Sequence, residues 1–400
     1  MTISAKADTG TVAKADPRVR RAHRAVAAVF AVHGAVAGTF ATRIPWIQEH
    51  QGIGTGQLGF ALMFAALGAS VAMPLAARIV HRLGMRTAVR VLLALWCASL
   101  ALPPLAPGLV GLCLAMFVYG GTAGMADVVM NAQGVEVEER LGRSIMSGLH
   151  GMWSVGTLLG SLVGVLAAHA DLDARVHLPA MALVLVVLGA YACRGVLDIR
   201  PAPEEAAPAR FSFPPKAALV IGAIGFCAVF AEGASMDWSA VYLRDIAHAS
   251  HGTAAASYTA FACTMAASRL AGDLVVRRFG PVRTVRAGGL LATAGGVLVV
   301  TAASQFAAIA GFALIGVGVA VVVPLCFAAA GRAGPVPSQA IAGVATVTYT
   351  SGLVAPAAIG SIAQATSLTV SFGLVTVLAA GLVLGAGVLR PAAGTPEKQP

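Results

Sequence analysis

The chain has 400 residues, of which 58% are hydrophobic and only 11% are charged. Because soluble globular proteins carry charge on about 25% of their residues, this composition excludes an ordinary soluble domain and indicates a membrane protein. The formal net charge of +10 would suggest a nucleic-acid partner in a soluble protein, but its distribution along the chain gives a different explanation.

Apolar windows of about 20 residues, long enough to cross a bilayer, recur along the whole chain. The first follows a basic segment that resembles the start of a signal peptide, but many further spans follow it, which predicts an uncleaved first helix. Twelve spans are predicted, at residues 25–45, 56–77, 88–104, 108–131, 145–168, 178–197, 217–242, 253–273, 287–303, 305–329, 339–361 and 368–389.

One long polar connection, residues 198–216, follows the sixth span and is rich in proline and charge. It predicts a cytoplasmic linker between an N-terminal six-helix bundle at 24–197 and a C-terminal six-helix bundle at 217–390. Cytoplasmic tails are predicted at 1–23, where the chain should be disordered, and at 391–400. The expected fold class is an all-α membrane protein with twelve transmembrane helices arranged as two six-helix repeats.

Lysine and arginine predict the orientation, because cytoplasmic loops of multi-span proteins carry an excess of both. All but three of the 27 fall in the tails, in the linker and in loops on one side of the predicted membrane. The exceptions are Arg43, Arg175 and Arg244. Both termini are therefore expected to be cytoplasmic, in a bacterial-type plasma membrane, and the basic charge reflects topology and no nucleic-acid partner.

The two halves align with each other at an offset of 196 residues, which places Gly84 against Gly280. At the same offset, residues 82–84 overlay 278–280, and Gly120 overlays Gly316. Internal repeats of this size are typical of transporter architecture.

The loop at 81–86 (HRLGMR) resembles the signature G-x-L-a-D-R-x-G-r-R of the major facilitator superfamily, and the loop at 277–281 (RRFGP) resembles its second copy. Both depart from the pattern, because His81 and Arg277 stand where the family has an acid. The resemblance implies that the loops act in gating. The gating residues that it indicates, together with an acid of the fourth loop, are Arg82, Gly84, Arg86, Arg278, Gly280 and Glu136.

Three further segments, at 127–133, 147–154 and 237–243, resemble a MosC-like subgroup of bacterial inner-membrane proteins that is distantly related to fucose permeases. The resemblance spans residues 24–390. It implies a carrier whose halves tilt about a central cavity lined by spans one, four, seven and ten, with small solutes bound near the midplane.

The seventh span carries two acids, Glu232 and Asp237, in a run that is otherwise apolar. A charge at the bilayer centre costs about 2.5–3.5 kcal/mol, so such residues usually face a cavity; the alternative is a position near the outer interface. Five residues turn a helix by about 140°, so both acids would face one cavity only if the helix broke, for which Gly233 offers a place. Glu232 is predicted to bind a substrate hydroxyl or to carry the coupling proton. Trp238 belongs either to an outer aromatic belt, which we favour, or to the substrate site.

Polar residues of the first and fourth spans are further candidates. His33 lies in the middle of its span and either relays protons or binds solute, or is a hydrogen-bonded packing residue. Arg43 is predicted to be an interface anchor in preference to a substrate contact. Asp127 and Asn131 share one helix face near the cytoplasmic end, where a gate, a structural role and substrate contact all remain open.

The fifth span carries a stripe of polar and aromatic side chains whose spacing suits a sugar or polyol, although a packing stripe is the alternative. It consists of His150, Trp153, Ser154 and Thr157. Gly156, Gly160 and Gly164 are predicted to form a close-packing seam on a different face, with an equivalent at Gly352, Pro356 and Gly360.

Charges near the cytoplasmic end suggest a gate. Arg269 and Asp273 are expected to pair with each other, since they lie four residues apart. We also expect acids of the fourth loop to pair with the basic eighth loop, and solvated loop charges are the alternative. The residues are Glu136, Glu138 and Glu139 on one side and Arg277, Arg278 and Arg283 on the other.

No nucleotide-binding, metalloprotease or serine-hydrolase motif is present, and the six cysteines lie singly in apolar runs. The sequence therefore predicts no enzyme, no cofactor and no metal site. It predicts a monomeric, proton-coupled secondary active transporter of a small polar organic solute such as a sugar or polyol. An effluxer of metabolites or drugs, or an uncoupled facilitator, is the alternative within transport, and a transport-dead membrane sensor is the alternative outside it.

Overall fold

A computed structural model describes residues 16–142, 145–198, 216–330 and 337–390. The predicted tail at 391–400, most of the linker and the first 15 residues lie outside this range. The described residues form helices joined by short connections, without strands. The first six long helices are α1 (Pro17–Ala41), α3 (Thr55–Leu83), α4 (Met85–Ser99), α6 (Gly108–Leu141), α7 (Met146–His169) and α8 (Ala174–Ala192). The next six are α9 (Lys216–Asp245), α10 (His251–Phe279), α11 (Pro281–Val300), α12 (Gln305–Val319), α14 (Pro337–Ala365) and α15 (Leu368–Gly385).

Three short helices complete the set: α2 (Ile44–Gln51), α5 (Leu102–Leu105) and α13 (Val322–Ala330). Every predicted span corresponds to one of the twelve long helices, and the all-α fold class is confirmed. The first helix is longer than predicted, because the Asp16 side chain accepts a hydrogen bond from the Arg18 N–H and Pro17 occupies the first turn. Residues 17–23, assigned to the tail from the sequence, are therefore helical.

Ten helical segments of the described chain are long and apolar enough to cross a membrane. The two long helices outside this group are α10 and α14. These are the helices that pack across the molecule, α10 against α7 and α14 against α3.

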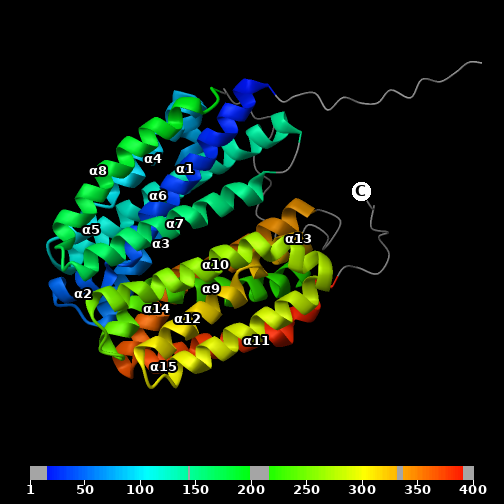
Figure 1. The fold of residues 1–400 in the computed structure, drawn as a ribbon. Coiled ribbons are helices and arrows are strands. Elements are labelled where there is room, and N and C mark those ends of the chain that lie inside the picture. Colours follow the sequence, from blue (N-terminus) through cyan, green and yellow to red (C-terminus); the bar gives the residue numbers. More distant parts are fainter. Residues whose placement is uncertain (1–15, 143–144, 199–215, 331–336, 391–400) are drawn as a thin grey trace, which may run out of the picture.

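The long helices gather into two bundles, one from α1 to α8 and the other from α9 to α15 (Figure 1). Within the first bundle α1 packs on α7 and α3 on α6; within the second α9 packs on α14 and α11 on α12. Both ends of the described chain lie at the same end of the molecule, opposite α2 (Figure 1). We call these the terminal end and the α2 end.

The two loops that align in the sequence also share a backbone conformation. Gly84 and Gly280 have φ of +76° and +77°, which residues with a side chain rarely adopt. Their N–H groups donate to Val80 O at 2.9 Å and to Val276 O at 2.8 Å, respectively. Each glycine thus ends one helix and starts the next, and the internal repeat is visible at both loops.

The glycine seam of α7 packs on α1. A Cβ atom at Gly156 would collide with the Ala31 carbonyl oxygen, and one at Gly160 with that of Ala35. The prediction that the polar stripe lies on a different face is wrong, because Gly34 and Gly38 of α1 contact the backbone of Trp153 and Thr157. The polar residues and the glycines of α7 follow one another at spacings of three and four residues. Both sets therefore lie on the side of α7 that faces α1.

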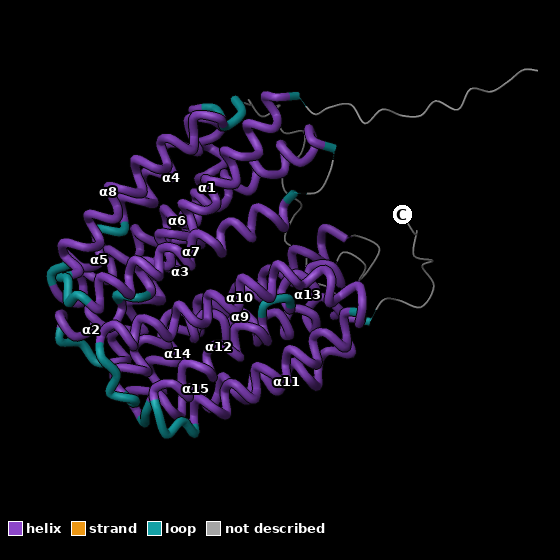
Figure 2. Tube along the Cα trace, viewed as in Figure 1, coloured by secondary structure: helices purple, strands orange, loops and turns teal. Residues whose placement is uncertain are grey.

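The series in α14 is not equivalent to the one in α7. Gly360 and the Pro356 carbonyl contact Gly59 of α3, in the other bundle, whereas a Cβ atom at Gly352 would contact nothing within 4 Å. Close to them, the Gly56 N–H donates to Gln364 Oε1 at 3.3 Å. At the α2 end the bundles therefore touch closely, and α7 and α10 lie side by side between the bundles (Figure 2).

Close packing at the α1–α7 seam predicts a large effect of one added methyl group. Gly156→Ala should destabilise the protein by about 1–3 kcal/mol, because the backbones must move apart. Gly148→Ala, in the same helix, is the matched control: its Cβ would contact nothing within 4 Å, so it should leave stability unchanged or raise it slightly. Thermal unfolding in detergent measures both, and equal midpoints for the two variants would contradict the seam.

Candidate functional site

His33 is the centre of a hydrogen-bonded network in the first bundle. Trp153 Nε1 donates to its Nδ1 at 3.0 Å, its Nε2 lies 3.3 Å from Ala123 O, and Trp96 Nε1 donates to its carbonyl at 3.2 Å. An indole N–H can only donate, so Nδ1 accepts and Nε2 carries the proton that reaches Ala123. His33 is buried. Of the two roles open from the sequence, this arrangement favours a neutral packing histidine that joins four helices.

The predicted sugar-binding stripe is not open as a unit. Ser154 and Thr157 are buried, and their hydroxyls donate to the carbonyls of His150 and Trp153 at 3.3 Å and 3.0 Å. The Trp153 nitrogen is used by His33. Only His150 of the four is exposed. The arrangement supports the packing alternative for three of the four side chains.

Five polar side chains from both bundles converge between α6, α7, α9 and α10, and we call them the polar cluster: Asp127, Asn131, His150, Glu232 and Arg269. Asn131 Nδ2 donates to Asp127 Oδ1 at 3.1 Å and to the Asp127 carbonyl at 2.8 Å. His150 interacts electrostatically with Asp127 on one side and with Arg269 of the other bundle on the other. Its edge also contacts Phe30, with ring centroids 5.3 Å apart.

The C-terminal bundle contributes an ion pair to this cluster. Arg269 Nη2 lies 2.9 Å from Glu232 Oε1, and each side chain is 25% exposed. Arg269 Nε also donates to the Ala320 carbonyl at 3.4 Å. The guanidinium of Arg269 thus reaches across to α9; its expected pairing with Asp273 stays a prediction, because the Asp273 side chain lies outside the described residues. A half-buried charge pair needs both partners, because loss of one leaves a charge poorly solvated.

Helix α9 corrects a further expectation. It runs unbroken from Lys216 to Asp245, so no break occurs at Gly233. Both acids nevertheless interact with Tyr258 of α10, and Asp237 also with Tyr119 of the first bundle. Glu232 and Asp237 point about 140° apart on a straight helix, yet both interact with the ring of Tyr258.

Trp238 is not part of an aromatic belt at the membrane surface. It is fully buried, and its Nε1 has no hydrogen-bond partner among the described residues. It packs in the hydrophobic core, out of contact with any open space. The belt prediction fails because helical position alone does not tell a lipid-facing aromatic ring from a core one.

Arg43 is also buried and does not extend to the membrane surface as an anchor. It is 3% exposed, and its Nη2 donates to the Leu172 carbonyl in the α7–α8 connection. Burial lowers the pKa of Arg43, and the carboxylates of Asp173 and Asp171 oppose this shift. The side chain therefore connects the start of α2 to the adjacent connection.

The predicted gating residues lie at the terminal end. Arg82 and Arg278 are exposed, and the Arg278 guanidinium lies 5.7 Å from the Phe279 ring centroid. Arg86 Nε donates to the Val196 carbonyl at 3.0 Å. Glu136 pairs with Arg140 at 2.7 Å, one turn along its own helix.

Glu138, another acid of the expected gate, binds the start of the next helix. Its Oε2 accepts from the N–H groups of Ile145 and Met146 at 2.6 Å and 2.9 Å. A carboxylate at this place stabilises the start of α7.

The ion pairs that join the bundles lie at the opposite, α2 end. Arg244 Nη2 of α9 lies 2.8 Å from Glu49 Oε2 of α2, and His251 Nδ1 of α10 lies 3.0 Å from Asp171 Oδ1. Sequence reasoning missed these pairs, although Arg244 is one of the three basic residues expected on that side. It also missed Arg269 as the partner of Glu232. The sequence does contain a signal for this pair, because an acid and a base lie within two consecutive spans.

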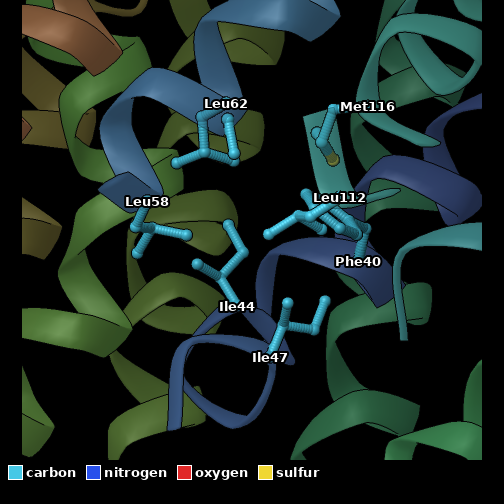
Figure 3. Close-up of a pocket in the computed structure, with 8 residues that line it drawn as sticks. Phe40, Ile44, Ile47, Leu58, Leu62, Leu112 and Met116 are labelled. Atoms are coloured by element: carbon cyan, nitrogen blue, oxygen red, sulfur yellow. The ribbon is translucent and has the colours of Figure 1, made fainter. Parts of the chain in front are cut away.

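A cavity in the first bundle is unsuited to a polar solute. Its walls are apolar side chains from α1, α2, α3 and α6, which point toward one another (Figure 3). They are Phe40, Ile44, Ile47, Leu58, Ala61, Leu62, Leu112 and Met116. This cavity is a gap in the hydrophobic core, and the polar cluster remains the candidate site.

A polar cluster between two six-helix bundles with repeated glycine loops is the arrangement expected of the resembled family, and comparison with known proteins decides the matter. The model of the Major Facilitator Superfamily matches residues 26–336. The chain belongs to this superfamily. Its relatives include the uncharacterized transporter y4wD of Sinorhizobium fredii, 34% identical over 341 residues, which cover 84% of this chain and 90% of the relative. The membrane protein MosC of Rhizobium meliloti is 29% identical over 337 residues, covering 84% and 82%.

Solved structures of transporters show the same fold. The nucleoside transporter NupG superposes with a TM-score of 0.72 at 11% identity, covering 92% of this chain and 99% of that one. A D-xylose-proton symporter superposes with a TM-score of 0.69 at 13% identity, covering 95% and 97%. The MosC-like resemblance and the twelve-helix architecture are thereby confirmed.

The His33 network predicts a coupling between two side chains. His33→Leu should destabilise the protein by about 1–3 kcal/mol, because it leaves the Trp153 N–H and the Ala123 carbonyl without partners. In a Trp153→Phe background the same change should cost less, since the donor is already gone. A double-mutant cycle of thermal unfolding measures the coupling; additive effects would show that the two rings do not interact.

Proposed function

We propose that the protein is a secondary active transporter of a small polar organic solute, such as a sugar or polyol, and that it works by alternating access. The observation that carries this proposal is the polar cluster, because its side chains come from both bundles and lie beside the contact of α7 with α10. Membership of a transporter superfamily and similarity to y4wD support it. In-span acids paired with an arginine also argue for transport and against a passive scaffold.

We further propose that the terminal end faces the cytoplasm of a bacterial-type plasma membrane. Arginines such as Arg82, Arg278 and Arg283 are exposed or half-buried at the terminal end, as expected for cytoplasmic loops. The α2 end then faces outward, and the contacts of Gly59 with Gly360 close it. In this orientation the structure corresponds to an inward-facing state.

In this proposal the Arg269–Glu232 pair couples the solute to protons. A proton on Glu232 removes its charge and releases Arg269, whose five N–H donors can then bind solute oxygens. Asp127 and Asn131 of the other bundle supply acceptors and a donor across the cavity. A solute that contacts both bundles stabilises an arrangement in which they approach, which is the coupling that alternating access requires.

The tilting bodies would be the N-terminal and C-terminal bundles, at residues 24–197 and 217–390, with a cytoplasmic linker between them. Contacts within each bundle, such as the seam of α1 with α7, are backbone-close and should persist during the movement. Contacts between the bundles should break at the α2 end as new contacts form at the terminal end.

The proposal predicts the behaviour of Glu232→Gln in proteoliposomes. A thermal-shift screen against sugars, inositols, amino acids and cationic drugs first identifies a solute, since a ligand of the native state raises the melting temperature. Glu232→Gln should then lower the accumulation driven by an imposed pH gradient by about tenfold, within the range typical of coupling free energies, while counterflow exchange of the solute persists.

Asp173→Asn is the matched control, because Asp173 also pairs with an arginine, Arg175 at 2.7 Å, but lies exposed outside the cluster. It should accumulate solute like the parent. Accumulation that survives collapse of the proton gradient in the parent would indicate an uncoupled facilitator. If the protein binds a solute but does not move it across the membrane, it is a sensor and the proposed transport function is wrong.

A further inference from the structure

A hollow of about 310 Å³ lies between the bundles at the α2 end. Its walls come from the α1–α2 junction and the end of α7 in one bundle, and from the end of α9 and the start of α10 in the other. The side chains of Asp171 and His251, which line it, are 79% and 44% exposed, so water enters from the α2 end. None of the residues that line the hollow belongs to the polar cluster.

Arg43, in one wall of this hollow, is a buried cation without an ion-pair partner among the described residues. It is 3% exposed; its Nη2 donates to a backbone carbonyl, and its Nε has no hydrogen-bond partner in the described chain. Asp173 and Asp171 interact with Arg43 electrostatically, but both are engaged elsewhere. Asp173 binds Arg175 at 2.7 Å. Asp171 lies 3.0 Å from Nδ1 of His251.

His177 of α8 also interacts with Arg43 and does not compensate its charge. The histidine is 4% exposed, and neither of its ring nitrogens has a hydrogen-bond partner within the described ranges. An imidazole is neutral or positive, so it cannot be the counterion of a guanidinium. Compensation of the Arg43 charge therefore has to come from its open side, which is the hollow.

The hollow favours an anion. A buried charge is costly unless a partner of opposite sign compensates it. Arg244 supplies a second guanidinium from the other bundle; its Nη2 lies 2.8 Å from Glu49 Oε2, which leaves further N–H donors for another acceptor. Asp245 also interacts with Arg244. The lining residues thus present the guanidinium groups of Arg43 and Arg244 against the one carboxylate of Asp171.

Part of the wall is apolar and suits the carbon skeleton of an organic molecule. Trp46, Pro45 and Ala168 line the hollow beside the charged residues. The Trp46 ring is stacked on His50, with the ring centroids 4.5 Å apart, and the Arg175 guanidinium lies 5.8 Å from the indole centroid. These contacts hold the indole in position. A fixed aromatic surface next to guanidinium groups matches a ligand that joins an apolar body to an anionic group.

We propose that this hollow is a binding site for a small organic carboxylate. The carboxylate oxygens accept hydrogen bonds from Arg43 and Arg244, and the carbon skeleton lies against Trp46, Pro45 and Ala168. Guanidinium groups bind the oxygens of carboxylates and of phosphates alike, so the phosphate of a lipid headgroup is the other source of the same chemistry. The site is separate from the polar cluster and requires neither transport nor proton coupling.

The test is a calorimetric titration of the whole protein with benzoate at neutral pH, in nanodiscs of phosphatidylcholine. Benzoate should bind saturably, whereas benzamide, which has the same ring without the charge, should not bind. Arg43→Gln and Arg244→Gln should each weaken benzoate binding by about tenfold or more, as expected for a lost hydrogen bond to a charged group. Arg244 is the more exposed of the two, so its variant keeps the test decisive if Arg43→Gln does not fold. Trp46→Ala should weaken benzoate binding more than acetate binding.

Arg140→Gln is the matched control, because Arg140 also pairs with a glutamate, Glu136 at 2.7 Å, but lies at the terminal end. It should bind benzoate like the parent. Affinity that is unchanged in Arg244→Gln and lost in Arg269→Gln would place the anion in the polar cluster and overturn the proposal. A parent that binds benzamide as well as benzoate, or that binds neither, would overturn it too.

A second set of nanodiscs, containing phosphatidylglycerol, distinguishes the two sources of the anion. A site for a free organic acid should keep its affinity for benzoate there at high salt, which screens the charge of the membrane surface. Loss of benzoate binding in these nanodiscs alone would show that a lipid headgroup occupies the hollow, and the organic acid would be ruled out. The polar cluster takes no part in these outcomes, so a failure here leaves the proposed transport function untouched.

Discussion

The hydrocarbon core of a membrane offers no hydrogen-bond partner to a polar group, and this constraint decides where the polar side chains of the chain lie. Ser154 and Thr157 satisfy it by donating to carbonyls one turn back in their own helix. His33 satisfies it with partners from three other helices, α4, α6 and α7. The polar cluster satisfies it with pairs inside each bundle, Asp127 with Asn131 in one and Glu232 with Arg269 in the other, and the two pairs meet between the bundles.

Small residues let helix backbones touch in two places, with different consequences. At α1–α7 the contact lies within one bundle and is reinforced by the hydrogen bond from Trp153 to His33. At α3–α14 it lies between bundles, where the only hydrogen bond described between the two helices is the one from the Gly56 N–H to Gln364. Dispersion attraction falls off steeply with distance, so a contact that depends mainly on it separates cleanly once a small gap opens. The first contact suits a permanent joint, and the second suits one that breaks in each transport cycle.

Hydropathy was sufficient to predict the twelve long helices and the fold class, because the bilayer imposes a length and an apolar composition on each span. The repeat at Gly84 and Gly280 could also be predicted from the sequence, since their positive φ favours glycine at both positions. Contacts between side chains of different helices could not be predicted. Arg269 could pair with Asp273 on its own helix or with Glu232 on the preceding one, and helical spacing alone indicates only the former. Trp238 was misplaced for the same reason, because a helical wheel shows which residues share a face but not whether lipid or protein covers that face.

The strengths of the two sets of ion pairs fit their places. Exposed pairs are worth about 0–1 kcal/mol each, so those of the α2 end contribute only weakly to the contact between the bundles. The pair of Arg269 and Glu232 is half-buried, and loss of one partner there leaves a charge that water solvates only in part. That pair should therefore stay intact unless a proton or a solute oxygen replaces one partner. The pairs that join the two bundles at the α2 end are thus the weaker set, and the half-buried pair inside the C-terminal bundle is the stronger one.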